Sequence, residues 1–219
     1  MIRHRAGGGR SRACLECPVA ISFIARNLPL IVAHYIRKHR PRVQAELASF
    51  AAEASLEAAV RRAGRAELSG QRRDPHHRRR RQEDLDAAVE RLVAGLASLE
   101  QCKTFEAVHD RVKALTRTVP NLGPLYEYDT ALRIAAKLGW RPRKVFLHAG
   151  ARQGARALGL PDGKSFWPGD IPDALAPLRE LEPYEIEDVL CIYKAKFGAA
   201  VLELSEESCR LPEDEGDDD

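Results

Sequence analysis

Apolar residues recur at spacings of three and four along most of the chain, which is the period of an α-helix that buries one face. Only residues 144–148, with the short apolar run VFL, fit a strand as well as the entry to a helix. Pro29 should kink or bound the first helix. The pattern predicts a mostly α protein, a multi-helix bundle, with helices over residues 18–39, 41–68, 84–99, 104–115, 129–138, 152–158 and 183–197.

Polar segments separate the helical regions. Residues 1–17 combine arginines with three consecutive glycines, so we expect a disordered basic N-terminus. Residues 71–82 read QRRDPHHRRRRQ and contain no apolar side chain. They predict a basic linker between an N-terminal helical region (18–70) and a C-terminal helical domain (83–200). Residues 206–219 hold eight acids and one arginine, and such a run is usually a solvated acidic tail.

The formal net charge of +3 conceals a strong separation of charge along the chain. Residues 1–81 contain 18 Lys or Arg and 6 acids, whereas residues 82–219 contain 17 and 26. Within the acidic half, residues 111–164 are basic, with 11 Lys or Arg against 3 acids. A basic patch of this kind supplies salt-sensitive, sequence-independent affinity for nucleic acid. An acidic tail can cover it when the polyanion is absent.

The cysteines and the N-terminus give no sign of secretion or of a membrane anchor. Five scattered cysteines, without the composition of a disulfide scaffold, indicate reduced thiols. The apolar run over residues 19–36 is interrupted by Arg26, Asn27 and Pro29. It therefore predicts neither a membrane-spanning helix nor a signal peptide. We expect a cytoplasmic protein.

One pair of cysteines has the spacing of a metal site. Cys14 and Cys17 form a C-x-x-C knuckle, but no second knuckle follows. His34 and His39 are the only plausible completing pair, and Pro18 lies between the knuckle and their helix. We expect no metal and no cofactor.

The segment VPNLGPLYEYDTALRIAAKLG, at residues 119–139, combines a Pro/Gly turn with the start of a helix. Backbone N–H groups at the head of a helix have no partner within it, so such a turn suits an anionic oxygen. The turn at residues 119–124 and the pair Thr130-Ala131, with Ile134 three places on, resemble the helix-hairpin-helix family. Asn121 stands where that pattern has its first glycine, and residues 125–128 form an insertion of about one helical turn.

The resemblance covers about twenty residues and implies DNA or RNA binding through the hairpin, mostly without reading sequence. Carried over to this chain, it assigns main-chain donors to Leu122 and Gly123 and flanking contacts to Thr130 and Arg133. The neighbouring basic residues extend the predicted DNA-binding surface, which comprises Lys137, Arg141, Arg143, Lys144, Arg152 and Arg156. The alternative is an ordinary solvated helical surface.

Some helix-hairpin-helix proteins are DNA glycosylases, in which an aspartate at a helix start, often followed by Thr, serves catalysis. Asp129-Thr130 is the candidate here. In the family the aspartate lies about twenty residues beyond the hairpin, whereas here five residues separate Asp129 from Gly123. The spacing favours Asp129 as an N-cap rather than as a catalytic group. At roughly the family distance, residues 145–152 contain no acid.

Three further features leave alternatives open. The amides of Gly150 and Ala151, with Arg152 and Arg156, could bind a second phosphate, but Gly150 and Gly154 also suit close helix packing. His148 could carry a proton or be a satisfied structural residue. Arg78 to Arg81 could contact nucleic acid or be a charged linker.

The hypotheses for function therefore fall into three classes. The first is a nucleic-acid-binding module, the second a helical interaction or regulatory protein without catalysis, for instance one of a bacterial gene pair, and the third a glycosylase-like enzyme. The Ala-rich helices over residues 41–99 could pack internally or form a homo-oligomer.

Overall fold

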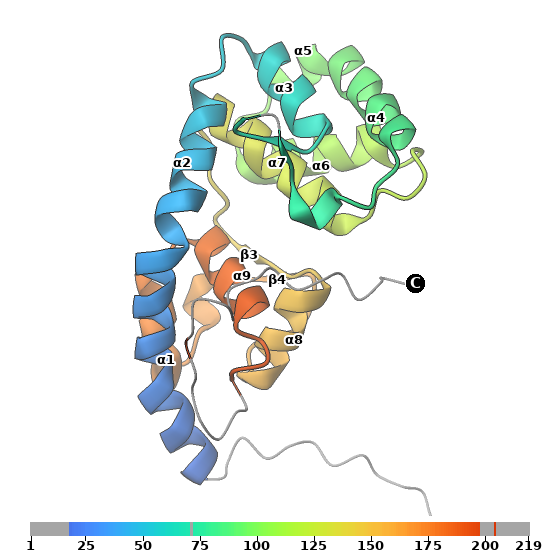
Figure 1. Cartoon of the computed structure of the whole chain (residues 1–219). Helices are drawn as coiled ribbons and strands as arrows, with labels where there is room; N and C mark the ends of the chain where they lie inside the picture. The colour runs from blue at the N-terminus through green and yellow to red at the C-terminus, as the bar shows by residue number, and fades with distance from the viewer. Residues whose placement is uncertain (1–17, 71, 198–203, 205–219) are drawn as a thin grey trace, which may run out of the picture.

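The computed structural model describes residues 18–70, 72–197 and 204, and the side chains from residue 27 onward (Figure 1). The predicted N-terminal and C-terminal tails, with Cys14 and Cys17, lie outside the described residues. The described part is mostly helical, as predicted, with two pairs of two-residue strands. Within it, no helix is long and apolar enough to cross a membrane.

Two consecutive helices form an arm along one side of the molecule (Figure 1). Helix α1 (Pro18–Lys38) continues through Pro29, and α2 (Arg40–Ala51) follows after His39. Backbone hydrogen bonds run on through the junction, because the amide of His39 donates to Tyr35 and the carbonyl of His39 accepts from Val43. The arm joins two lobes, since the buried side chains of α1 belong to one hydrophobic core and those of α2 to another.

The first lobe contains α3 (Leu56–Gly64), α4 (Gln82–Ala94), α5 (Leu96–Glu100), α6 (Phe105–Thr116) and α7 (Pro124–Leu138). Helix α7 lies at its centre, packed against α2, α3 and α6. The predicted single helix over 41–68 is wrong, because α2 ends at Ala51 and α3 begins after an extended Ser55. The Ser55 hydroxyl accepts from the amide of Ala58 at 3.1 Å and starts the new helix.

Residues 72–82 of the predicted basic linker fold as part of this lobe. Strands β1 (Glu67–Leu68) and β2 (Arg72–Arg73) pair antiparallel, and the 3₁₀ helix η1 (Pro75–His77) follows. Asp74 caps η1 by accepting from the amide of His76 at 2.9 Å, and His77 is fully buried. The segment has no apolar residues, which favours an exposed linker. Its polar side chains are nevertheless buried, because they have polar partners. The regions on either side of it share one core through the contacts of α2 and α3 with α7.

The second lobe packs against α1. It contains β3 (Val145–Phe146), α8 (Ala149–Ala157), β4 (Ser165–Phe166), η2 (Pro168–Asp170), η3 (Asp173–Glu180) and α9 (Pro183–Ile192). The undecided run VFL supplies the strand β3, which pairs antiparallel with β4. Gly154 lets α8 approach α9 closely, because an added Cβ would lie 2.1 Å from the carbonyl oxygen of Leu190. The packing interpretation of Gly154 therefore fits the structure.

Candidate functional site

The predicted hairpin connects α6 to α7. Helix α7 begins at Pro124, so residues 125–128 form its first turn and do not separate the hairpin from the helix. Asn121 has a φ of 60°, a left-handed conformation that asparagine tolerates better than most residues. Its side chain donates to Asp84 at 3.0 Å, which fixes the turn against the start of α4.

The turn is open towards solvent at the head of α7. Gly123 is the N-cap residue, and among the described residues no side chain makes a capping hydrogen bond to this helix. A Cβ placed on Gly123 would meet nothing within 4 Å. The first backbone N–H groups of α7 that follow Pro124 thus have no side-chain acceptor among the described residues, and such groups can donate to an anion.

Two of the predicted contacts lie inside the molecule, which corrects their assignment to the surface. Thr130 is completely buried, and Arg133 is 7% exposed and forms an ion pair with Asp74. Both follow from the early start of α7, which turns these positions towards the core. Lys137, one turn further, donates to the backbone carbonyls of Ala51 (3.2 Å) and Glu53.

The remaining predicted cations lie beyond the far end of α7 or on α8. Arg141 and Arg143 are exposed, and the Nζ atom of Lys144 lies 4.7 Å from the ring centroid of Trp167. On α8, Arg152 donates to the carbonyl of Leu147 at 3.2 Å, and Arg156 forms an ion pair with Asp162 at 2.7 Å. Because α7 has 15 residues, its ends are about 22 Å apart. The structure therefore does not bring the predicted basic surface together with the hairpin.

A different group of cations lies beside the hairpin. The arginine run, residues 78–81, is held between two contacts to this region. On its N-terminal side His77 bonds to Asp129 of α7 at 2.8 Å, and on its C-terminal side Asp84 accepts from Asn121. Arg78, Arg79 and Arg81 are exposed. Sequence reasoning left the role of this run open because nothing local shows where it folds.

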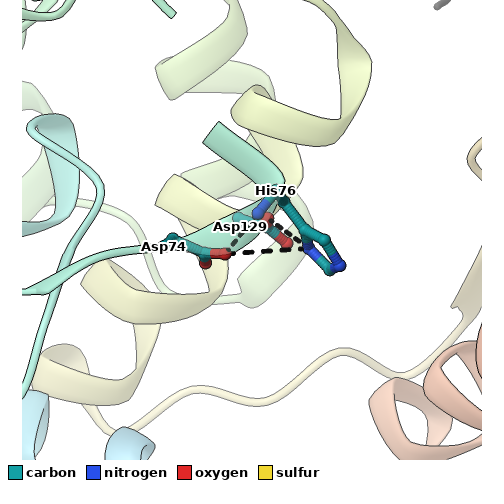
Figure 2. Close-up of side chains that lie close together, drawn as sticks. All are labelled: Asp74, His76 and Asp129. Atoms are coloured by element: carbon teal, nitrogen blue, oxygen red, sulfur yellow. Dashed lines mark hydrogen bonds and ion pairs between the residues drawn. The ribbon is translucent and has the colours of Figure 1, made fainter. Parts of the chain in front are cut away.

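A cluster of acids and histidines joins η1 to α7 (Figure 2). The Nδ1 atom of His76 lies 3.6 Å from Asp129 Oδ2 and 4.0 Å from Asp74 Oδ1. His77 Nε2 contacts the same Asp129 oxygen at 2.8 Å, and Arg133 pairs with the other oxygen of Asp74. Asp129 thus lies inside α7 rather than at its cap, which corrects the N-cap prediction.

Asp129 and His76 of the cluster carry opposite charges. Burial alone would raise the pKa of Asp129, but its interactions with His76 and His77 lower that pKa well below its usual range. Burial works to lower the pKa of His76, whereas Asp129 and Asp74 raise it to about 9. At neutral pH the structure therefore places an aspartate anion against an imidazolium.

Helix α9 brings more acids to the same place. Burial, with repulsion from Asp188 and Asp129, raises the pKa of Glu187 well above its usual range. Burial likewise raises the pKa of Asp188, to about 7, although its carboxylate accepts from the Tyr35 hydroxyl at 2.7 Å. Burial at this place therefore favours the neutral, protonated forms of Glu187 and Asp188 over their carboxylates.

A cavity of about 440 Å³ opens between the arm, η1, α7 and α9. Its polar wall includes Asp74, His76, Asp129, Arg133 and Asp188. Lys38 and Arg42, from the arm, also line it. This volume lies within the range of about 300–1,000 Å³ usual for small-ligand sites.

Several buried polar atoms close to this cluster have no hydrogen-bond partner among the described residues. They are the Tyr128 hydroxyl, Arg133 Nη1, His77 Nδ1 and both ring nitrogens of His148. His148 is thus not a satisfied structural residue, and burial lowers its pKa to about 4. Buried polar groups are nearly always paired in proteins, so their concentration here marks a place where a ligand or water belongs.

Comparison with known proteins adds no assignment: no family model, curated protein or solved structure matches the chain.

Proposed function

We propose that the chain binds the backbone of nucleic acid, without reading sequence, through the hairpin at residues 119–124 and the arginine run at residues 78–81. The observation that carries this proposal is the uncapped, open head of α7 at Gly123, held beside the arginine run by the Asn121–Asp84 and His77–Asp129 bonds. Main-chain donors and guanidinium groups are the usual partners of phosphate oxygens.

A salt titration tests this proposal. The affinity for generic duplex DNA and single-stranded DNA should fall steeply between low and moderate salt, because each neutralised phosphate releases counterions. A double variant, Arg78→Ala with Arg79→Ala, should weaken binding and make the salt dependence shallower. The matched control is Arg141→Ala with Arg143→Ala, which removes two exposed arginines far from the hairpin. An equal or larger loss in the control would overturn the proposed surface, as would affinity that is weak and independent of salt.

The hairpin can be tested without disturbing the fold. The open space at Gly123 accepts a side chain, and its φ of −99° suits any residue. Gly123→Asp should cap α7 and place a negative charge where phosphate would bind, so DNA binding should fall while stability is kept. Gly123→Asn is the uncharged control. If Gly123→Asp leaves the DNA affinity unchanged, the hairpin is not the contact.

Catalysis on nucleic acid is a second candidate, favoured by the position of Asp129 at the cavity. Gly123 and Asp129 are six residues apart on one helix, about 9 Å along its axis. A strand held by the hairpin would therefore lie within two helical turns of an ionised carboxylate. The glycosylase-like hypothesis is the specific form of this candidate.

Incubation with damaged duplex DNA tests the catalytic candidate. Base release or strand cleavage that disappears in Asp129→Asn, with DNA affinity preserved, would support it. An inert wild-type protein, or equal activity in Asp129→Asn, would remove it.

A further inference from the structure

We infer that Asp74, His76 and Asp129 form a binding site for one divalent transition-metal ion at the wall of the cavity. Their ligand atoms all lie within 4.8 Å of one another (Figure 2). This inference does not depend on nucleic-acid binding.

The spacing of the ligand atoms suits a small ion. Bonds of about 2.0–2.2 Å to nitrogen and oxygen place neighbouring ligand atoms about 3.0–3.5 Å apart in octahedral or tetrahedral geometry. The two separations from His76 Nδ1, 3.6 Å and 4.0 Å, need to contract by only a few tenths of an ångström. His76 must release its proton to the solvent when the ion binds, because only a neutral imidazole nitrogen coordinates a metal. One neutral imidazole and two carboxylates then favour Zn²⁺, Mn²⁺ or Fe²⁺ over Ca²⁺ or Mg²⁺.

Outer contacts hold each carboxylate in position. Asp129 is bonded by His77, which is fully buried, and Asp74 accepts from the amide of His76 and from Arg133. Arg133 pairs with Oδ2 of Asp74, whereas His76 faces Oδ1, so the arginine leaves the ligand oxygen in place. Metal ligands in proteins are usually oriented by such a surrounding layer.

Two independent observations point to a bound ligand. The three residues line the cavity, so water or substrate can complete the coordination, which is the arrangement of a catalytic metal rather than of a closed structural one. Arg133, 93% buried, lines the same cavity and has Nη1 without a hydrogen-bond partner. That nitrogen could donate to a water or an anion on the metal.

The site can be tested with Mn²⁺, whose free-ion electron paramagnetic resonance signal falls on binding. The full chain should bind one ion, and His76→Gln should weaken binding by at least tenfold. A variant with Cys14→Ser and Cys17→Ser controls for the other metal-like motif of the sequence and should bind as the wild type does. Binding unchanged in His76→Gln, binding lost in the cysteine variant, or no binding to the wild type would each overturn the inference.

A second variant tests the outer contact to Asp129. His77→Ala removes a positioning contact to Asp129 and should weaken Mn²⁺ binding by about 10- to 100-fold. Thermal unfolding with and without Mn²⁺ supplies an independent readout, because an ion bound only to the native state raises the midpoint. The midpoint should rise for the wild type and rise less for His76→Gln at the same Mn²⁺ concentration. If the midpoint rises equally in both, the ion binds elsewhere.

This test is separate from that of the proposed function because it contains no nucleic acid. Loss of DNA binding in the Arg78/Arg79 variant would leave Mn²⁺ binding intact, and the reverse would hold for His76→Gln. A metal on Asp129 and a direct role of that carboxylate as a base exclude each other. If catalysis is found, its loss on adding a chelator supports the metal, and full activity in the chelator overturns a catalytic role for it.

Discussion

Two regions that differ in burial and in how they are assembled meet at the first turns of α7. The hairpin at residues 119–124 is open and local, and its features are a left-handed Asn121 and an uncapped Gly123. The cluster around Asp129 is largely buried and is assembled from η1 and α7 beside α9, which are far apart in the chain. Local backbone geometry can be predicted from a short motif, whereas a cluster assembled by tertiary contacts cannot. The two regions should also respond differently to substitution.

The largest change in the free energy of unfolding should come from breaking the buried ion pair between Arg133 and Asp74. Arg133→Met leaves the Asp74 carboxylate buried and without its charged partner, which should lower the free energy of unfolding by about 3–5 kcal/mol. Arg61→Ala is the control, since its pair with Glu57 is exposed and should cost no more than about 1 kcal/mol. Urea denaturation measures both. Equal losses would mean that the cluster contributes no more than a surface contact.

Replacing the buried Glu187 should have a smaller effect on stability, and this effect should depend on pH more than the effect of replacing a surface acid. A carboxyl whose pKa is raised by folding stabilises the protein at low pH, and this contribution is lost as the pH rises through the folded-state value. Glu187→Gln should therefore match the wild type near pH 4 and be more stable at pH 8, on the order of 1–3 kcal/mol. Exposed Glu90→Gln should change stability by less than about 0.5 kcal/mol. A stability difference for Glu187→Gln that does not grow between the two pH values would contradict this charge assignment.

The next largest loss of stability should come from substituting Asn121 in the hairpin turn. Asn121→Ala places a Cβ residue without local hydrogen bonding at a φ of 60° and removes the bond to Asp84, which should cost about 1–2 kcal/mol. Asn121→Gly relieves the backbone strain and isolates the loss of the Asp84 bond. Thermal unfolding of the three proteins ranks them. Alanine as stable as asparagine would show that the hairpin is not held in this conformation.

The smallest effect should appear at the head of α7. Gly123→Asp supplies a capping carboxylate and should stabilise the protein by a few tenths of a kcal/mol. The same substitution is expected to weaken DNA binding, so stability and affinity should move in opposite directions. Guanidinium denaturation at low salt measures the gain. A clear loss of stability would indicate that the space at Gly123 is already needed by the native structure.

The helices could be predicted because their apolar stripes are local, and their boundaries were less certain. The break at Ser55 and the start at Pro124 depend on capping and turn geometry that periodicity does not register. The resemblance to the helix-hairpin-helix motif predicts that Thr130 and Arg133 lie at the surface. Both are buried, because α7 begins before the residue at which the motif places its second helix.

The cluster could not be predicted for a different reason. The sequence DPHH, residues 74–77, was read as part of a solvated basic run, because its partner Asp129 follows more than fifty residues later. The signal in the sequence is a pair of histidines two residues after an aspartate, within a segment otherwise made of arginine, glutamine and one proline. An ordinary charged loop can carry the same residues, so the pattern alone does not predict the cluster.

The arm of α1 and α2 determines how anything reaches the cavity. Each helix is anchored in a different lobe, and two contacts tie the arm to α9: Tyr35 to Asp188 at 2.7 Å and Arg40 to Glu185 at 2.8 Å. Bending the arm at His39 would break the Arg40–Glu185 tie, whereas Tyr35 and Asp188 belong to the same lobe and would stay together. A molecule that enters the cavity therefore passes between two lobes that the Arg40–Glu185 pair helps to hold together.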